Sequence, residues 1–157
     1  MRLRTRPPLA PAPRPIVALM ESAQKPLELI LARNLLSSIS TPAFLVDRDG
    51  VLIFYNDAAG VLLGKAFEER GTMSPEEWGQ TFGPFDEHDE AIPFEQLPIT
   101  RALRDGRPVH AHIHLRSASG ERHRVELSAL PIVGTESFRG AMAIFWPTAD
   151  NGAEAGA

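Results

Sequence analysis

The pattern of apolar and polar residues divides the middle of the chain into helices followed by strands. In residues 26–40, PLELILARNLLSSIS, apolar side chains recur every three to four positions, at Leu27, Ile30, Leu31, Leu35 and Ile39. This spacing predicts a helix with one broad apolar side, and Pro26 fits its first turn. An apolar side of this width requires a cover, from the rest of the chain or from a second subunit.

Two short β-rich runs follow, and Asp49-Gly50 lies between them in AFLVDRDGVLIFYN, residues 43–56. An Asp-Gly pair suits the positive φ angles of a tight turn, so this segment is predicted to form an antiparallel hairpin. Asn56 stands where a helix cap belongs, ahead of DAAGVLLG, and Gly64 can end that helix.

Two helices are predicted in the middle third. SPEEWGQTF begins with Ser74 as the cap and Glu77 three residues later, which is the capping-box spacing. FEQLPITRALRDGRP has Pro98 in its first turn and ends at Gly106. Its inward side chains are expected to be Leu97, Ala102 and Leu103.

The last third alternates apolar and polar residues with a period of two, in VHAHIHLRS, RHRVELSALPIV and FRGAMAIFW. Gly120 and Gly134 separate these runs, which predicts three antiparallel strands. The order of elements is therefore helix, hairpin, short helices and three strands, an α+β arrangement.

Composition narrows the function. The 157 residues are 43% hydrophobic and 23% charged, which indicates one soluble domain with an adequate core. The net charge of −4 comes without a basic stripe, and no apolar run approaches about 18 residues, so neither nucleic acid nor a membrane is expected as a partner. The absence of cysteine excludes disulfides, thiolate nucleophiles and cysteinyl cofactor adducts, and fits a cytoplasmic protein.

The two ends differ in composition from the middle. Residues 1–23 are basic and proline-rich and are expected to be a disordered arm, while the small and acidic residues 148–157 are expected to be a disordered tail. Between them we expect a flanking helix in residues 24–40 and one domain in residues 41–147.

Several motifs in residues 40–147 together resemble the PAS domains. The turn in VDRDGVL and the asparagine in YNDAAG are similar to that family's first hairpin and first helix. The middle resembles a PAS subclass that reads W, F, an acidic turn and then P-x-E-x-x-P-x-x-R-A-L-x-x-G, here PFEQLPITRALRDG. GERHRVELSALPI and FRGAMAIFW are similar to the last two strands. FDEHDEA departs from the P-D-G turn that is frequent in the subclass.

The resemblance implies a five-stranded antiparallel sheet with short helices on one face, a small cavity for a ligand or cofactor, and signalling through flanking helices, commonly in homodimers. On this basis we expect a cavity lined by Trp78, Phe82, Leu103, Ile113, Leu115, Val125 and Leu127. The expected interface residues are Leu27, Ile30, Leu31, Leu35, His110, His112 and His114.

The alternating histidines of VHAHIHLRS belong to one face of a strand. A turn centred on Gly120 would place Leu115 opposite Val125, Ile113 opposite Leu127, and Ala111 opposite Ala129. It would also place His114 opposite Glu126 and His112 opposite Ser128, on the other face. We therefore expect an aliphatic cavity side, with the histidines under the N-terminal helix or against a second subunit. Because imidazoles titrate near pH 6.5, such a seam would be sensitive to pH.

Cofactor and metal sites are less well supported. Haem would require an axial ligand from inside the cavity, and the helix FEQLPITRALRD has no histidine. Two of the three histidines at most could share one metal ion, because the outer two lie about 13 Å apart along a strand. DEHDE, residues 86–90, is either a cation site or a solvated loop, and its composition favours the loop.

The sequence thus predicts a sensory or regulatory module without catalytic activity and without a cofactor. It would bind a small ligand, or none, in an apolar cavity and would signal to a partner protein in trans through its flanking helix. Two alternatives stay open: a dimerisation scaffold without a ligand, and a haem- or metal-binding protein that uses the strand of His110, His112 and His114.

Overall fold

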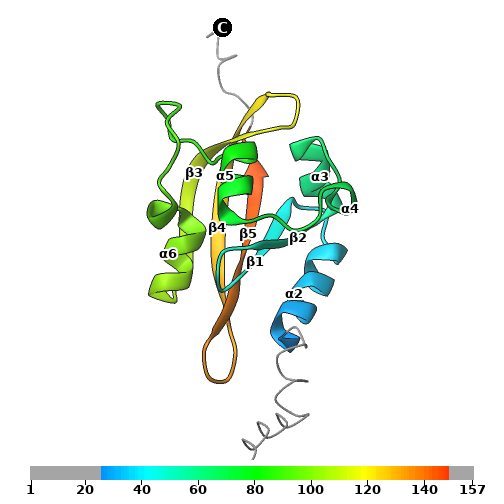
Figure 1. Ribbon diagram of the computed structural model, residues 1–157, viewed down its shortest axis with the longest axis vertical. Coiled ribbons are helices and arrows are strands. Elements are labelled where there is room, and N and C mark those ends of the chain that lie inside the picture. The colour runs from blue at the N-terminus through cyan, green and yellow to red at the C-terminus, as the bar shows by residue number, and fades with distance from the viewer. Residues whose placement is uncertain (1–25, 149–157) are drawn as a thin grey trace, which may run out of the picture.

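The computed structural model describes residues 26–148 and contains one five-stranded antiparallel sheet (Figure 1). The strand order is β2-β1-β5-β4-β3, so the pairing of β5 with β1 joins the first hairpin to the last three strands in one sheet. The strands are β1 (Ala43–Asp47), β2 (Leu52–Tyr55), β3 (Val109–Arg116), β4 (Arg122–Val133) and β5 (Phe138–Pro147). The predicted α+β fold with five antiparallel strands is confirmed.

Short helices cover the inner face of the sheet, and one longer helix lies against the outer face. Those that contribute to the inner core are α3 (Asp57–Leu63), α5 (Pro75–Phe82) and α6 (Pro98–Asp105), and the outer one is α2 (Leu27–Ser38). Figure 1 shows α6 beside β3, and α3 on the opposite side of the domain, toward β2. The sequence pattern missed α4 (Phe67–Arg70), which is too short to show a helical period. The pattern predicts one helix over residues 94–105, but the structure divides this segment at Leu97 into the 3₁₀ helix η1 (Phe94–Gln96) and α6.

The predicted caps of α3 and α5 are confirmed, whereas Pro26, expected in the first turn of α2, is the residue that precedes it. The Asn56 side chain accepts a hydrogen bond from the Ala59 N–H at 3.0 Å and caps α3, which ends at Gly64 in the left-handed conformation. Ser74 and Glu77 form the reciprocal capping box that begins α5. These local signals held because each acts within a few residues and does not depend on distant packing.

The predicted pairing of β3 with β4 is wrong by two positions. Ala111 pairs with Leu127, Ile113 with Val125, and Leu115 with His123. The loop is the reason: the Gly120 N–H bonds to the Ser117 carbonyl, and the Ser117 N–H bonds to the Glu121 carbonyl, so the hairpin is centred on Ser119. Gly120, with φ of +87°, is the last residue of a three-residue loop, the usual place of glycine in this type of hairpin.

A shift of two positions keeps every side chain on its predicted face. On the outer face, His110 now lies opposite Ser128, His112 opposite Glu126, and His114 opposite Arg124. The first hairpin also has a three-residue loop that ends in a glycine. Only Gly50 of the predicted Asp49-Gly50 pair has a positive φ, +81°, and the Gly50 N–H bonds to the Asp47 carbonyl.

Two apolar clusters lie on opposite sides of the sheet. The larger one fills the space between the sheet and helices α3, α5 and α6. The smaller one joins α2 to the outer face, and its buried members are Leu29, Ala32, Leu36, Ala43, Leu45, Phe54 and Ile132. Gly140 permits this close packing, because a Cβ there would overlap the Val46 carbonyl oxygen and touch Leu29.

The buried side of α2 is not the predicted apolar stripe. Leu27, Leu31 and Leu35 are 65%, 58% and 56% exposed, and Ile30 is also exposed. The helix carries apolar residues on both sides, so the helical period alone could not select the side that docks on the sheet. The expectation that α2 covers the histidine strand is wrong as well, since its cluster draws no residue from β3.

The predicted arm, residues 1–23, and nearly all of the predicted tail, residues 148–157, lie outside the described residues. Within residues 26–148, no helix has the length and apolar content to cross a bilayer.

Candidate ligand-binding cavity

A cavity lies within the inner cluster, between the sheet and the helices. It offers ≈ 40 Å³ to the centre of a water-sized sphere. All five strands contribute a wall residue, and α3, α5 and the segment from Leu97 to Ile99 close the other side. The walls are Phe44, Leu52, Tyr55, Leu63, Trp78, Phe82, Gly83, Pro84, Leu97, Pro98, Ile99, Ile113, Leu115, Leu127 and Phe145.

Aromatic rings form much of the cavity wall and hold one another in place. Phe44 lies 5.7 Å from Phe145 and 6.5 Å from Trp78, measured between ring centroids. Tyr55 meets Phe82 edge to face at 6.4 Å. Tilted and edge-to-face pairs of this kind add stability beyond the burial of their area.

The two wall side chains with a polar atom direct that atom away from the cavity. The Trp78 Nε1–H donates to the Gly50 carbonyl at 3.0 Å, which ties α5 to the first hairpin. The Tyr55 hydroxyl donates to the Lys65 carbonyl at 2.7 Å. Burial raises the pKa of Tyr55, partly offset by the positive charge of Arg70, so the phenol stays neutral. The cavity wall is therefore entirely apolar.

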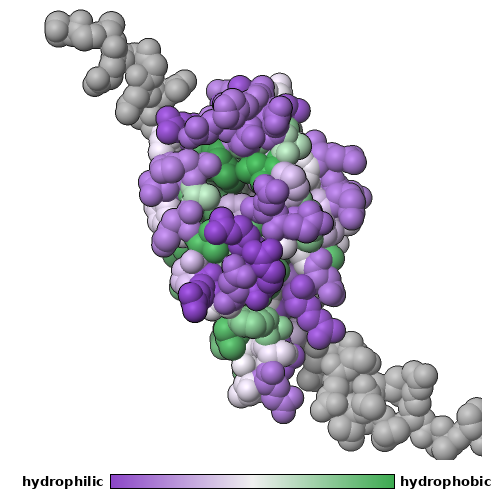
Figure 2. Space-filling view, turned by 90° about the vertical axis from the view of Figure 1, so that its left-hand side faces the viewer, coloured by the Kyte–Doolittle hydropathy of each residue, from purple (hydrophilic) through white to green (hydrophobic). Residues whose placement is uncertain are grey.

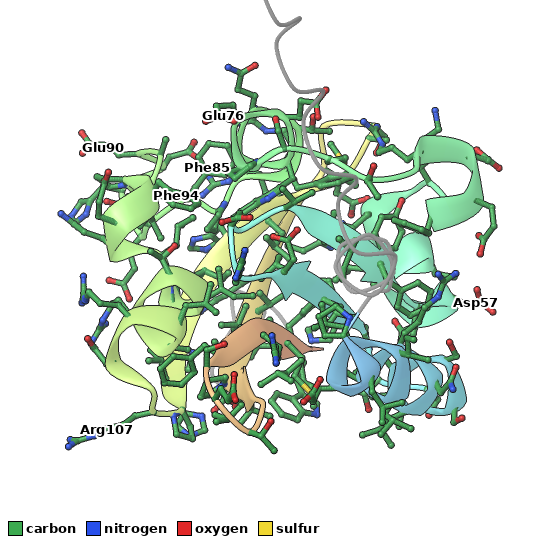
Figure 3. All side chains as sticks on the ribbon, turned by 60° about the horizontal axis from the view of Figure 1, so that its bottom comes forward. Asp57, Glu76, Phe85, Glu90, Phe94 and Arg107 are labelled. Carbon is green, nitrogen blue, oxygen red and sulfur yellow. The ribbon has the colours of Figure 1, made fainter. Side chains whose placement is uncertain are left out.

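Charged side chains lie at the periphery of the domain. Glu76, Glu90 and Arg107 point outward in Figure 3. Figure 2 views the face that carries α6 and the β3 edge, where hydrophilic side chains cover most of the surface and leave small hydrophobic areas between them.

The structure brings five of the seven predicted cavity residues together, namely Trp78, Phe82, Ile113, Leu115 and Leu127. Leu103 and Val125 do not line the cavity. Val125 is fully buried within the inner cluster, whereas Leu103 is half-buried at its edge, because α6 turns Ile99 and Ala102 toward the sheet.

Sequence reasoning missed the remaining walls, including Phe44, Tyr55 and Phe145. The signal was available in the alternation of each strand: residues two apart from a cavity residue share its face. No sequence pattern could place Pro84 and Leu97 at the cavity, because these residues lie in connections between elements whose path depends on the whole fold.

The three histidines of β3 lie on the face opposite the cavity. The Nδ1 of His110 lies 2.7 Å from the Ser128 hydroxyl, and the Nδ1 of His114 lies 3.1 Å from the Asp86 carbonyl oxygen. His112 is exposed beside Glu126. No three potential metal ligands of residues 26–148 gather into a site, and an axial haem ligand from this strand would have to reach through the sheet.

The acidic segment 86–90 forms a compact turn at the β3 edge. The Asp86 carboxylate accepts the N–H groups of Glu90 and His88 at 2.9 and 2.8 Å. The bond from Glu90 is the main cause that lowers the pKa of Asp86. Asp89 forms an ion pair with Arg122 at 3.2 Å. The Asp86 carboxylate therefore stabilises the turn, and Asp89 ties the turn to β4.

Asn56 connects α2 to the cavity half of the domain, which its role as a helix cap did not reveal. Its side chain is only 3% exposed. Nδ2 donates to the carbonyls of Leu36, Ile39 and Thr41 at 3.0, 3.3 and 2.8 Å. Oδ1 accepts the N–H groups of Ala43 and Ala59 at 3.1 and 3.0 Å. One amide thus joins the end of α2, the start of β1 and the start of α3.

Comparison with known proteins identifies the fold. The family model described as PAS fold matches residues 36–150. The PAS domain of nitrogen regulation protein NR(II) from Vibrio parahaemolyticus is 14% identical, has a TM-score of 0.54, and the match covers 75% of this chain and 98% of that one. The Rhodobacter sphaeroides LOV protein is 16% identical with a TM-score of 0.63, and the match covers 80% of this chain and 70% of that one. The PAS domain of Bordetella pertussis BvgS is 14% identical with a TM-score of 0.54, and the match covers 79% of this chain and 88% of that one. No curated protein matches the chain.

Proposed function

The chain belongs to the PAS fold family, as its motifs indicated, and from this premise we propose that it is a sensory module whose cavity binds a small molecule. Occupancy of the cavity would change how α2 packs on the sheet, and α2 would pass that change to a partner protein. Members of this family are in general signalling modules without catalysis, and we extend that expectation, together with the absence of a cofactor and a cytoplasmic location, to this chain.

One observation carries the proposal: the cavity and α2 share the same strands on opposite faces. In β1, Phe44 lines the cavity, while its neighbours Ala43 and Leu45 belong to the α2 cluster. In β5, Phe145 lines the cavity and Ile144 packs on the α2 side. A ligand that displaces the Phe44 or Phe145 ring therefore moves backbone on which α2 rests. Close-packed interiors transmit such displacements rather than absorb them.

The exposed side of α2 supports a second part of the proposal, a homodimer. Its stripe of Leu27, Ile30, Leu31 and Leu35 is self-complementary across a two-fold axis, since the same residues would face each other. A second copy of the chain is the occupant that this geometry favours. Packing of α2 in one subunit would then set the geometry of the dimer.

The test uses the full chain purified from cells. Native mass spectrometry and the absorption spectrum report a retained ligand and the oligomeric state, and fractions of a cell extract are screened for a rise in melting temperature. Any ligand found is then added while hydrogen exchange of the amides from Leu29 to Leu36 is followed. We expect a stabilising fraction that also changes exchange in α2.

A scaffold without a ligand is the second candidate, favoured by the small cavity volume. If no fraction raises the melting temperature while the chain is dimeric, the sensory proposal fails and the scaffold is correct.

A further inference from the structure

We infer that the ligand of the cavity is a small uncharged molecule without hydrogen-bonding groups, of the chemical class of hydrocarbons and apolar gases. This inference rests on the proposed function and specifies the class of its ligand. It follows from the polar inventory of the wall, from the volume, and from the nature of the wall groups.

The cavity wall presents no polar atom with which a ligand could form a hydrogen bond. Of the fifteen wall residues only Tyr55 and Trp78 carry a polar side-chain atom, and both atoms are engaged with backbone carbonyls outside the cavity. The Gly83 N–H donates to Gly79, and the Pro84 carbonyl accepts the Ile92 N–H. A ligand hydroxyl would therefore enter without a partner, and a carboxylate would lose its hydration without a counter-ion.

The volume sets the size. The ≈ 40 Å³ open to the centre of a water-sized sphere is far below the volume of the pockets that hold drug-sized ligands, which is about 300–1,000 Å³, so a haem or a flavin does not fit. Water itself is a poor occupant, because it requires two to four polar partners. An apolar cavity of roughly 150 Å³ accepts benzene or xenon, and xenon, the smaller of the two, is the better match to this smaller cavity.

The nature of the wall favours polarisable apolar ligands. Five aromatic side chains, Phe44, Tyr55, Trp78, Phe82 and Phe145, surround the space together with branched aliphatic groups. A benzene-sized ring could meet these in the tilted geometry that the wall rings already adopt with one another.

The experiment titrates the full chain with xenon, benzene, phenol and benzoate and follows the methyl NMR signals of Ile113 and Leu127. We expect saturable shifts with xenon and benzene. Phenol should bind about ten- to a hundredfold more weakly than benzene, because its hydroxyl loses hydration without a partner. Benzoate should produce no shift of these methyl signals. Phenol or benzoate binding as tightly as benzene overturns the inferred class, and so does the absence of binding by both xenon and benzene.

A matched pair of variants locates the site. Leu127→Phe fills the cavity and should abolish benzene binding, whereas Leu130→Phe introduces the same change on the outer face of the same strand and should leave binding intact. The ligand series on the unmodified chain decides the question if Leu127→Phe does not fold.

The experiment distinguishes an error in the inferred ligand class from an error in the proposed signalling function. Hydrogen exchange of α2 is measured in the same samples. Benzene that binds without any change in α2 contradicts the proposed signalling and leaves the ligand class standing. Equal binding of phenol with a change in α2 contradicts the class and leaves the signalling standing.

Discussion

Replacing Asn56 by Asp separates the two functions of this side chain. The variant keeps the oxygen that accepts the Ala43 and Ala59 N–H groups, so the α3 cap and the start of β1 are preserved. It replaces the donor Nδ2 by an oxygen that faces three carbonyls at the end of α2, at 2.8 to 3.3 Å. The expected result is a loosened α2 on an otherwise folded domain.

The magnitude follows from burial. Each hydrogen-bonding group left unsatisfied in the interior costs about 1–3 kcal/mol, and this variant leaves the three carbonyls without their donor and adds a buried negative charge. We expect the free energy of unfolding at pH 7 to fall by about 3–5 kcal/mol, a large share of the stability of a small domain. Burial and the carbonyls should also raise the pKa of the introduced carboxyl above its unfolded value. The variant therefore regains stability as the pH falls, because the protonated acid can donate to one carbonyl.

Urea unfolding of the full chain at pH 7 and near pH 4.5 measures both effects, and hydrogen exchange of the α2 amides localises them. Asn34→Asp is the control, since it makes the same chemical change at an exposed position on α2. Equal stability of the two variants at pH 7, or a deficit at Asn56 that does not shrink at lower pH, would refute the reasoning.

Three further predictions concern the dimer, the packing of the sheet and the behaviour at high pH. Leu31→Asp should weaken the homodimer at least about tenfold in analytical ultracentrifugation, because a charge in an apolar interface costs more than 1.4 kcal/mol, whereas Val61→Asp, also on an exposed apolar residue, should not. Gly140→Ala should lower the free energy of unfolding by about 3 kcal/mol or more, because its Cβ overlaps backbone. Gly79→Ala, within α5 and with open space around its Cβ, should raise it by about 0.5–1 kcal/mol. A stable Gly140→Ala variant, or a Gly79→Ala variant that is destabilised as much, would contradict the packing argument. Burial raises the pKa of Tyr55 above its ordinary value of 10.0, so the free energy of unfolding should be constant just below pH 10 and fall above it, while Tyr55→Phe removes that fall. An unchanged fall in Tyr55→Phe would show that another group is responsible.

The site was predictable to the extent that it depends on alternation. Trp78, Ile113 and Leu127 could be placed at the cavity because the period of two in the strands and the capping box of α5 fix which way each side chain points. Of the five side-chain hydrogen bonds of Asn56, the cap to Ala59 was predictable from its spacing. The other four were not, because they connect Asn56 to residues 13 to 20 positions away.

Local sequence patterns were sufficient to predict the order of the longer elements, the starts of α3 and α5, and the faces of residues 111–115 and 125–129 in β3 and β4. These features depend on interactions within a few residues, and a register error of two positions leaves each face unchanged. The tertiary structure alone decided the register of β3 against β4, since the pattern accepts any shift of two and only the conformation of the Gly120 loop selects one. It also decided which apolar side of α2 is buried. Leu29, Ala32 and Leu36 dock because they fit the surface of β1 and β5 over Gly140, and Leu27, Leu31 and Leu35 remain outside. Complementarity between surfaces distant in sequence makes that choice, and no periodicity within one helix contains it.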